Sequence, residues 1–254
     1  MRGHLRALAD TLRLPVACSL FLVAASAVTA PSQAYANQEL IPTKAEYKAS
    51  YKKGIPIRGT AVRELKQLED GSWSYNFDVN SFIVDINERV NFQWVNDYIR
   101  PTNYSYERSG WVKDKKATVD FDWTKMSVRN NVENKPWSMT IPEQTLDKLS
   151  YQLQLRLDLA KGITDLTYKV ADGGHLKEFV FSVVGEEKLD TRLGKIDCIV
   201  VEKVRKPDSD RQTRLWFAKD WNYLLVQMVQ IEPDGEKYEI YLEKAKVGDR
   251  VIKP

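Results

Sequence analysis

Few residues in this chain could carry out chemistry. The 254 residues include only two histidines and two cysteines. His175 follows Asp172–Gly174, and a loop histidine beside flexible glycines could act as a general base. However, the sequence pattern places no serine, cysteine or cluster of metal ligands where it would act together with His175. We therefore prefer to interpret this segment as a hairpin turn with a solvated histidine.

Asp120 and Asp122 provide the second candidate for chemistry, because alternate residues of a strand project from one face. Glycosidases use such paired carboxylates as acid and base or nucleophile. One hypothesis is therefore a hydrolase of an envelope polymer, with His175 assisting. Polar alternation on a solvated strand explains the pair equally well, so the composition favours a protein that is not an enzyme. No catalytic residue, metal or cofactor is predicted.

Two further residues have simpler structural interpretations. Cys198 lies within the apolar segment Ile196–Val204, where a buried cysteine packs like a small hydrophobic residue. Asp147 lies at the beginning of a predicted helix, where a carboxylate can cap free backbone N–H groups. Both residues are predicted to serve the fold.

The N-terminal 36 residues predict export. Three arginines lie within residues 2–13, an apolar run extends from Leu14 to Val28, and Ala34–Ala36 forms an A-x-A cleavage site. This order is typical of a secretory signal peptide. Residues 37–254 are expected to form a single β-rich domain in the periplasm, with no integral membrane segment after cleavage. Because Cys18 would be removed, Cys198 would have no disulfide partner.

The charge balance gives no reason to expect a nucleic acid as partner. The whole chain has a formal charge of only +3, and removal of the signal peptide would bring it closer to zero. Nucleic-acid binding depends on a marked excess of basic residues. An apolar ligand or another envelope protein fits the composition better.

Alternation of apolar and polar residues predicts a β-rich fold. Trp73–Val79 alternates with period two and follows Thr60–Leu68 through the turn Glu69–Ser72, which predicts a hairpin. Other predicted strands are Val90–Trp94, Val119–Trp123, Phe179–Val183, Ile196–Val204, Thr213–Phe217, Tyr223–Ile231 and Lys237–Leu242. Strands with one apolar face indicate an antiparallel sheet that is covered on one side.

One principal helix is predicted, from Thr145 to Lys161. Thr145 could serve as N-cap, Asp147 would lie in the first turn, and Gly162 would end the helix. Leucines occur on two of its faces, so we expect it to be buried against the sheet. The predicted fold is mainly β, a large twisted antiparallel sheet or open half-barrel wrapped around this helix.

A family resemblance supports this architecture. Its motifs are Tyr47–Tyr51 with Gly54 and Gly59, Leu146–Ser150, Val183–Glu187 with Thr191 and Gly194, and Leu215–Ala218 with Asp220 and Tyr223. In this order and spacing the chain resembles the exported bacterial family called domain of unknown function 3108, over roughly Tyr47 to Leu242. The resemblance implies a fold and a periplasmic address, but no reaction. The chain is also similar to the half-barrel of periplasmic lipoprotein carriers.

The aromatic side chains suggest a function. Trp94, Phe92, Phe121, Trp123 and Tyr151 are predicted to line a groove for an apolar or lipid-like ligand. The alternative is that they form a filled core. The leading hypothesis is a non-enzymatic periplasmic binding or scaffold protein of the cell envelope. A purely structural partner that pairs through an exposed edge strand is a further alternative.

Overall fold

The computed structural model describes residues 39–53 and 55–254, all of which belong to the compact unit Asn37–Pro254. The predicted signal peptide, residues 1–36, lies outside the described residues, so export, cleavage and the resulting domain boundary stay predictions. Within the described part of the chain, no helix is long and apolar enough to cross a membrane.

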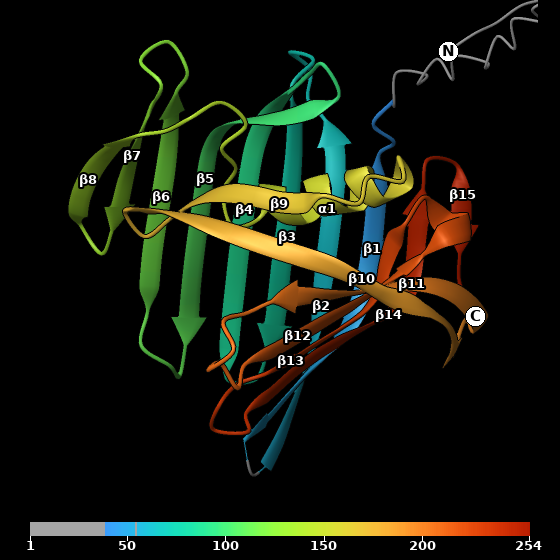
Figure 1. Ribbon diagram of the computed structural model, residues 1–254. Helices are drawn as coiled ribbons and strands as arrows, with labels where there is room; N and C mark the ends of the chain where they lie inside the picture. Colours follow the sequence, from blue (N-terminus) through green and yellow to red (C-terminus); the bar gives the residue numbers. More distant parts are fainter. Residues whose placement is uncertain (1–38, 54) are drawn as a thin grey trace, which may run out of the picture. The chain divides into compact units, whose positions relative to one another are not determined.

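The described residues form one antiparallel sheet of 15 strands (Figure 1). Its N-terminal half comprises β1 (Thr43–Lys53), β2 (Ile55–Gln67), β3 (Trp73–Ser81), β4 (Val84–Val95), β5 (Tyr98–Gly110), β6 (Lys115–Asp122), β7 (Ser127–Val132) and β8 (Lys135–Thr140). Its C-terminal half comprises β9 (Leu166–Asp172), β10 (His175–Thr191), β11 (Gly194–Val204), β12 (Gln212–Ala218), β13 (Leu224–Ile231), β14 (Lys237–Val247) and β15 (Arg250–Ile252). Helix α1 (Ser150–Ala160) connects the halves, and the 3₁₀-helix η1 (Lys219–Trp221) follows β12.

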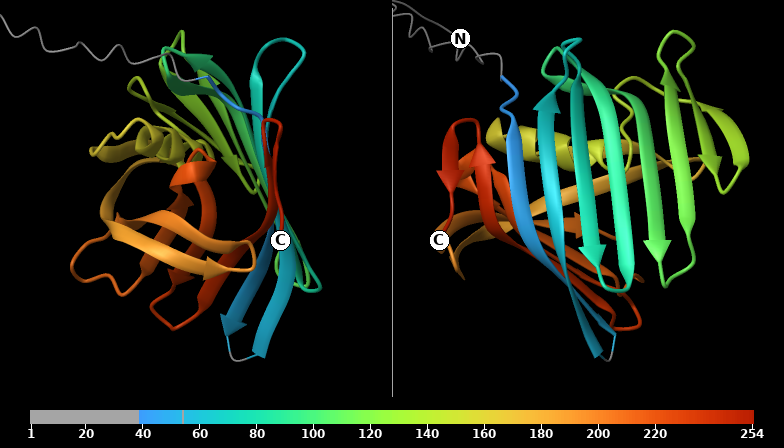
Figure 2. Two further views of the ribbon diagram at one scale, coloured as in Figure 1. Left: turned by 90° about the vertical axis from the view of Figure 1, so that its right-hand side faces the viewer. Right: turned by 180° about the vertical axis from the view of Figure 1, so that it is seen from behind.

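Two meanders make up the sheet, and they join at β1 and β14. The spatial order runs from β8 down to β1, then from β14 down to β9, while β15 pairs with β14. Figures 1 and 2 show that the sheet curls, so that β9 and β10 pass across the concave face of the N-terminal strands. The sheet does not close, since β8 and β9 end the order. The predicted fold class, an open and mainly β structure around one helix, is confirmed.

The predicted beginning of the helix is wrong by five residues. Helix α1 starts at Ser150, not at Thr145, because the preceding segment pairs with β9 instead. The Leu146 N–H donates to Lys169 O at 2.8 Å, and the Ala171 N–H donates to Leu146 O at 2.8 Å. The predicted end is confirmed: Gly162 adopts a positive φ of 72°, which a glycine tolerates without strain.

The core lies between the concave face and α1. Leu153, Leu155, Leu157 and Leu159 are all buried, as is the polar Gln154 between them. The helix contacts β5 on one side and β9 on the other. It is therefore covered on both sides, as its two leucine faces predict, and each buried leucine stabilises the fold by about 1.5–3 kcal/mol.

Candidate binding sites on the concave face

An apolar groove of about 430 Å³ remains open on the concave face. Its apolar lining comes from five strands and two connecting turns: Ala49, Phe77, Val79, Ile83, Val84, Ile86, Val112, Met228 and Ile240. Small-molecule sites are usually apolar clefts of about 300–1,000 Å³ with a few polar groups. The groove has the size and character of such a site.

The groove exists because α1 crosses the N-terminal strands and covers only part of their length (Figures 1 and 2). A helix with its side chains is about 10–12 Å wide, whereas the 13 residues of β2 extend about 43 Å. On β4, Val90 and Phe92 are fully buried, while Ile86 on the same face is only half-buried and lines the groove. The same apolar face therefore forms core at one end and an open site at the other.

At Gly59 the groove is lined by the backbone alone, without a side chain. A Cβ atom at this position would lie 2.5 Å from Asn80 O and 2.9 Å from Ser81 Cβ, so no side chain fits between β2 and β3. Gly59 is one of the residues that carry the family resemblance, and this close approach is the physical reason for a glycine there.

A smaller cavity of about 120 Å³, more polar than the groove, adjoins it, since Tyr106 and Arg108 of β5 line both. The turn between β9 and β10 covers it. Gly173 in this turn lines the cavity, and Gly174 packs so tightly on Trp137 of β8 that a Cβ there would lie 3.2 Å from Cδ1. His175, the next residue, is exposed at the start of β10.

Polar and charged side chains surround this cavity. Asn130 is only 1% exposed, and neither its Oδ1 nor its Nδ2 has a hydrogen-bond partner among the described residues. Lys115 and Lys148 line the mouth, where both are exposed. The lining acid is Asp172, and its carboxylate pairs with Lys177 Nζ at 2.7 Å.

Glu88 lies deeper, behind the tyrosines of β5. It is buried and accepts a hydrogen bond from the Tyr104 hydroxyl at 2.8 Å. Burial raises the pKa of the Glu88 carboxyl, although the positive charge of Lys148 opposes this shift. Tyr104, which lines the polar cavity, thus lies between this cavity and the buried carboxyl of Glu88.

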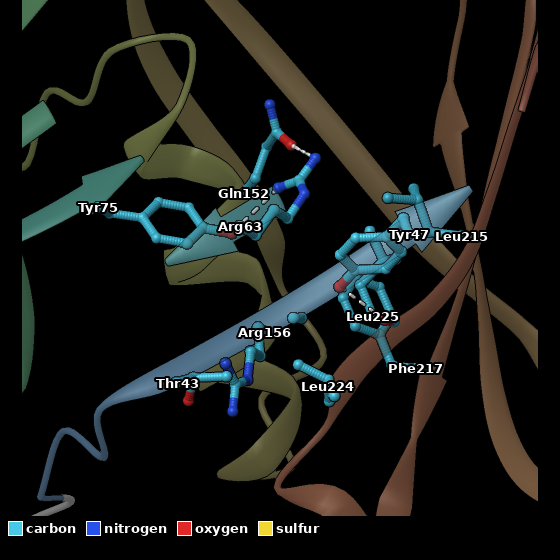
Figure 3. Close-up of a pocket in the computed structure, with 11 residues that line it drawn as sticks. Thr43, Tyr47, Arg63, Tyr75, Gln152, Arg156, Leu215, Phe217, Leu224 and Leu225 are labelled. Carbon is cyan, nitrogen blue, oxygen red and sulfur yellow. Dashed lines mark hydrogen bonds between the residues drawn. The ribbon is translucent and has the colours of Figure 1, made fainter. Parts of the chain in front are cut away.

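Two buried arginines connect α1 to the rest of the core (Figure 3). Arg63 of β2 donates to the Tyr75 hydroxyl at 3.0 Å and to Gln152 Oε1 at 2.8 Å. The Nε of Arg156 donates to Asn222 O at 2.9 Å, and burial lowers the pKa of Arg156. The cavity between them is about 20 Å³, room for about one water. These side chains fix the helix rather than form an open site.

The five predicted ligand-binding residues lie in or beside the core, and the groove is lined by other residues. Phe92 is fully buried, whereas Trp94 is half-buried with Lys161 Nζ 5.8 Å from its ring centroid. Trp123 donates to Pro101 O at 2.6 Å and stacks on Phe121 with centroids 5.6 Å apart. Tyr151 packs against Phe179 and Phe181, with centroid distances of 5.1 and 5.8 Å. Their role in ligand binding stays a prediction.

The three residues of the hydrolase hypothesis, Asp120, Asp122 and His175, have separate environments. Asp120 is exposed, and Asp122 pairs with Lys125 at 2.9 Å, a contact that lowers the pKa of Asp122. No hydrogen bond or ion pair among the described residues links His175 to either carboxylate. The described part of the chain also contains no group of three or more His, Cys, Asp or Glu residues that could hold a metal ion.

Cys198 is buried and Asp147 caps the helix, as the sequence indicates, although Asp147 precedes α1 instead of lying in its first turn. Cys198 is fully buried, and this burial raises the pKa of its thiol to about 11. Asp147 is also fully buried, and its Oδ1 accepts hydrogen bonds from the Leu149 and Ser150 N–H groups at 2.8 and 2.9 Å. It therefore caps the helix from outside the first turn.

Fold and site together define an open antiparallel half-barrel that wraps one helix and keeps an apolar groove beside it. The family model described as "Protein of unknown function (DUF3108)" matches residues 46–243, so the chain belongs to this family. The resemblance recognised from the sequence motifs is thereby confirmed. No curated protein matches the sequence at a significant level.

One solved structure with a TM-score above 0.5 supports the fold. The β-barrel-like protein of domain of unknown function DUF1849 from Brucella abortus is 9% identical, with a TM-score of 0.56 over 82% of this chain and 98% of that chain. A DUF1329 family protein from Desulfovibrio piger is 13% identical, with a TM-score of 0.22 over 81% and 85% of the two chains. The MucA/MucB complex structure from Pseudomonas aeruginosa is 7% identical, with a TM-score of 0.14 over 84% and 92%. The two lower scores establish no common fold.

Proposed function

We propose that this protein is a non-catalytic binding protein of the bacterial cell envelope, which holds an acyl-chain-like ligand in its apolar groove. The observation that carries this proposal is the groove of about 430 Å³ that α1 leaves open on the concave face. Burial of apolar ligand surface in such a cleft contributes about 25 cal/mol for each Å² removed from water. A ligand with a long apolar chain gains most from this site.

Exposed aromatic residues beside the groove support the same proposal. Phe82 and Trp111 are 77% and 74% exposed, and their ring centroids lie 4.8 Å apart. Each is adjacent in the chain to a groove residue, namely Ile83 and Val112. The apolar surface thus continues from the groove into solvent, where an apolar ligand could first make contact. Large exposed apolar side chains that cluster in this way often mark interaction sites.

The periplasmic location in this proposal is inferred from the sequence. The predicted signal peptide and the exported family that the chain resembles both favour the periplasm, where an apolar ligand needs a protein to cover its chain. Native mass spectrometry of the protein purified from the periplasm tests the proposal. We expect an additional mass that disappears on denaturation, and a fluorescent fatty acid should bind to protein from which this ligand was removed.

Two variants of β4 make this test specific. Ile86→Glu places a carboxylate on the groove face, and Asn87→Glu places the same group on the exposed opposite face. Ile86→Glu should lose the bound mass and the fluorescent probe while its unfolding midpoint stays near that of Asn87→Glu. If the wild-type protein carries no ligand and does not bind the probe, the proposal is wrong.

A scaffold role is the second candidate, favoured by the end of the sheet. Strand β8 (Lys135–Thr140) is a terminal strand of the order, and Trp137 on it is 60% exposed. Terminal strands can accept an additional strand from a partner. Co-purification of one envelope protein with the wild type, and its loss in Ser138→Pro, whose backbone N–H faces away from β7, would support this role. Recovery of the same protein from both samples would contradict it.

A further inference from the structure

We infer that the ligand is an anionic amphiphile, whose chain lies in the apolar groove and whose acidic headgroup enters the adjoining polar cavity. This inference rests on the proposed function, because it assigns the second part of the ligand to the second part of the same site. The headgroup class is an oxyanion, a carboxylate or a phosphate, and it would contact Arg108, Lys115, Lys148 and Asn130.

The two parts of the site lie side by side on the sheet. Tyr106 and Arg108 alternate on the concave face of β5, and both line the groove as well as the cavity. The groove is mostly apolar, whereas the cavity contains an amide, two ammonium groups and a guanidinium along its lining. One molecule that fills both must therefore be apolar at one end and polar at the other.

The charge of the cavity selects a negative headgroup. Within the described residues, Arg108, Lys115 and Lys148 form no ion pair with a carboxylate. Arg108 instead donates to the backbone oxygen of Lys113 at 2.9 Å, and Lys148 Nζ lies 5.7 Å from the Tyr106 ring centroid. Asp172, the acid of the lining, is already paired with Lys177. The cavity thus has an excess of positive charge, which attracts anions and repels cations.

The unpaired side chain of Asn130 supports a bound headgroup independently of the charge of the cavity. Buried side-chain amides in native proteins are nearly always hydrogen-bonded, and each unpaired buried group costs about 1–3 kcal/mol. Both polar atoms of Asn130 are unpaired, although the residue is 1% exposed and lines the cavity. Its Nδ2 can donate to a headgroup oxygen, and its Oδ1 can accept from a hydroxyl or from a water that accompanies the headgroup.

The size of the cavity limits the headgroup. A volume of about 120 Å³ admits a carboxylate or a phosphate monoester together with a water. A fatty acid or an acyl phosphate monoester therefore fits the site.

Displacement of a fluorescent fatty acid by four dodecyl compounds tests the inference, because they share one chain and differ in headgroup. Dodecanoate and dodecyl phosphate should bind at least about tenfold more tightly than dodecanol or dodecyltrimethylammonium, as charge-assisted contacts would give. If all four bind equally, the headgroup inference is overturned and the apolar groove stands. If none binds, the proposed function itself fails.

Variants locate the headgroup. Lys115→Gln and Lys148→Gln should each reduce the preference for the anionic compounds several-fold without changing the affinity for dodecanol. Lys169→Gln is the matched control, since Lys169 is exposed on β9 and lines neither part of the site. An unchanged preference in both cavity variants would overturn the assignment. Inorganic phosphate alone is the remaining probe: if it binds as tightly as dodecyl phosphate, the cavity is a site for free phosphate and the amphiphile is excluded.

Discussion

The capping of α1 by Asp147 allows a sharp prediction about stability. Its Oδ1 accepts from the Leu149 and Ser150 N–H groups, and its Oδ2 accepts from the Ser150 hydroxyl at 2.7 Å. The Asp147 N–H in turn donates to Ser150 Oγ at 2.9 Å. This reciprocal pattern satisfies several groups at the beginning of the helix. Asp147→Ala removes the side-chain acceptors.

The size of the effect follows from burial. Asp147 and Ser150 are both 0% exposed, so water does not replace the lost acceptor. Each orphaned donor costs about 1–3 kcal/mol, and loss of an N-terminal cap costs about 0.5–2 kcal/mol. Because these terms describe partly the same contacts, we expect Asp147→Ala to lower the free energy of unfolding by about 2–4 kcal/mol.

Urea denaturation measures this change. The midpoint should fall in Asp147→Ala with little change in the m-value, because the surface exposed on unfolding is the same. Asp147→Asn retains one oxygen acceptor and should lose roughly half as much. Asp120→Ala is the control, since an exposed carboxylate changes stability by less than about 0.5 kcal/mol. A loss below about 1 kcal/mol in Asp147→Ala would refute the assigned cap.

Three further predictions concern single residues of β11 and β2. Burial lowers the pKa of Lys203 to about 7, so from pH 7 to about 10.4 the unfolded chain holds a proton that the folded chain lacks. The free energy of unfolding should therefore rise with pH from about 7 to 8.5, above which the raised pKa of Cys198 contributes an opposite slope, and denaturation over this interval should show no such rise in Lys203→Met. Gly59→Ala should lose about 1–3 kcal/mol, measured as a lower urea midpoint, because its Cβ would lie 2.5 Å from Asn80 O. Cys198 should react with a thiol reagent only after denaturation, and rapid labelling of the native protein would contradict its burial.

Alternation of apolar and polar residues predicts a strand wherever one face of that strand packs against the core along its whole length. Strand β5 is not evident from this pattern because its register with β4 shifts between Asn91 and Phe92. Pro101 and Tyr104 are both buried, although three positions separate them, and Thr102 between them is exposed. A β-bulge of this kind breaks the alternation on which the prediction depends.

From the sequence, the candidate site could be assigned to one face of the sheet, but not to a position on that face. Sequence alternation identifies the aromatic face, but the end that stays open depends on the position of α1. Contacts between distant residues fix that position: Arg63 donates to Gln152, and the Ile99 N–H donates to Gln154 Oε1 at 3.0 Å. The polar cavity depends likewise on the turn at Gly173, which pairing within the C-terminal half brings over β5–β8.

The junction of β1 and β14 has a consequence for folding. Thr43 pairs with Val247 and Tyr47 with Leu242, so the centre of the sheet joins the two ends of the described chain. Contacts this distant in sequence form late, because a long loop must close first. The groove takes residues from both sides of this junction, Phe77 on one side and Ile240 on the other. Each meander can form its own hairpins separately, but the groove is complete only once the two meanders have joined, so that capacity to bind reports a closed junction.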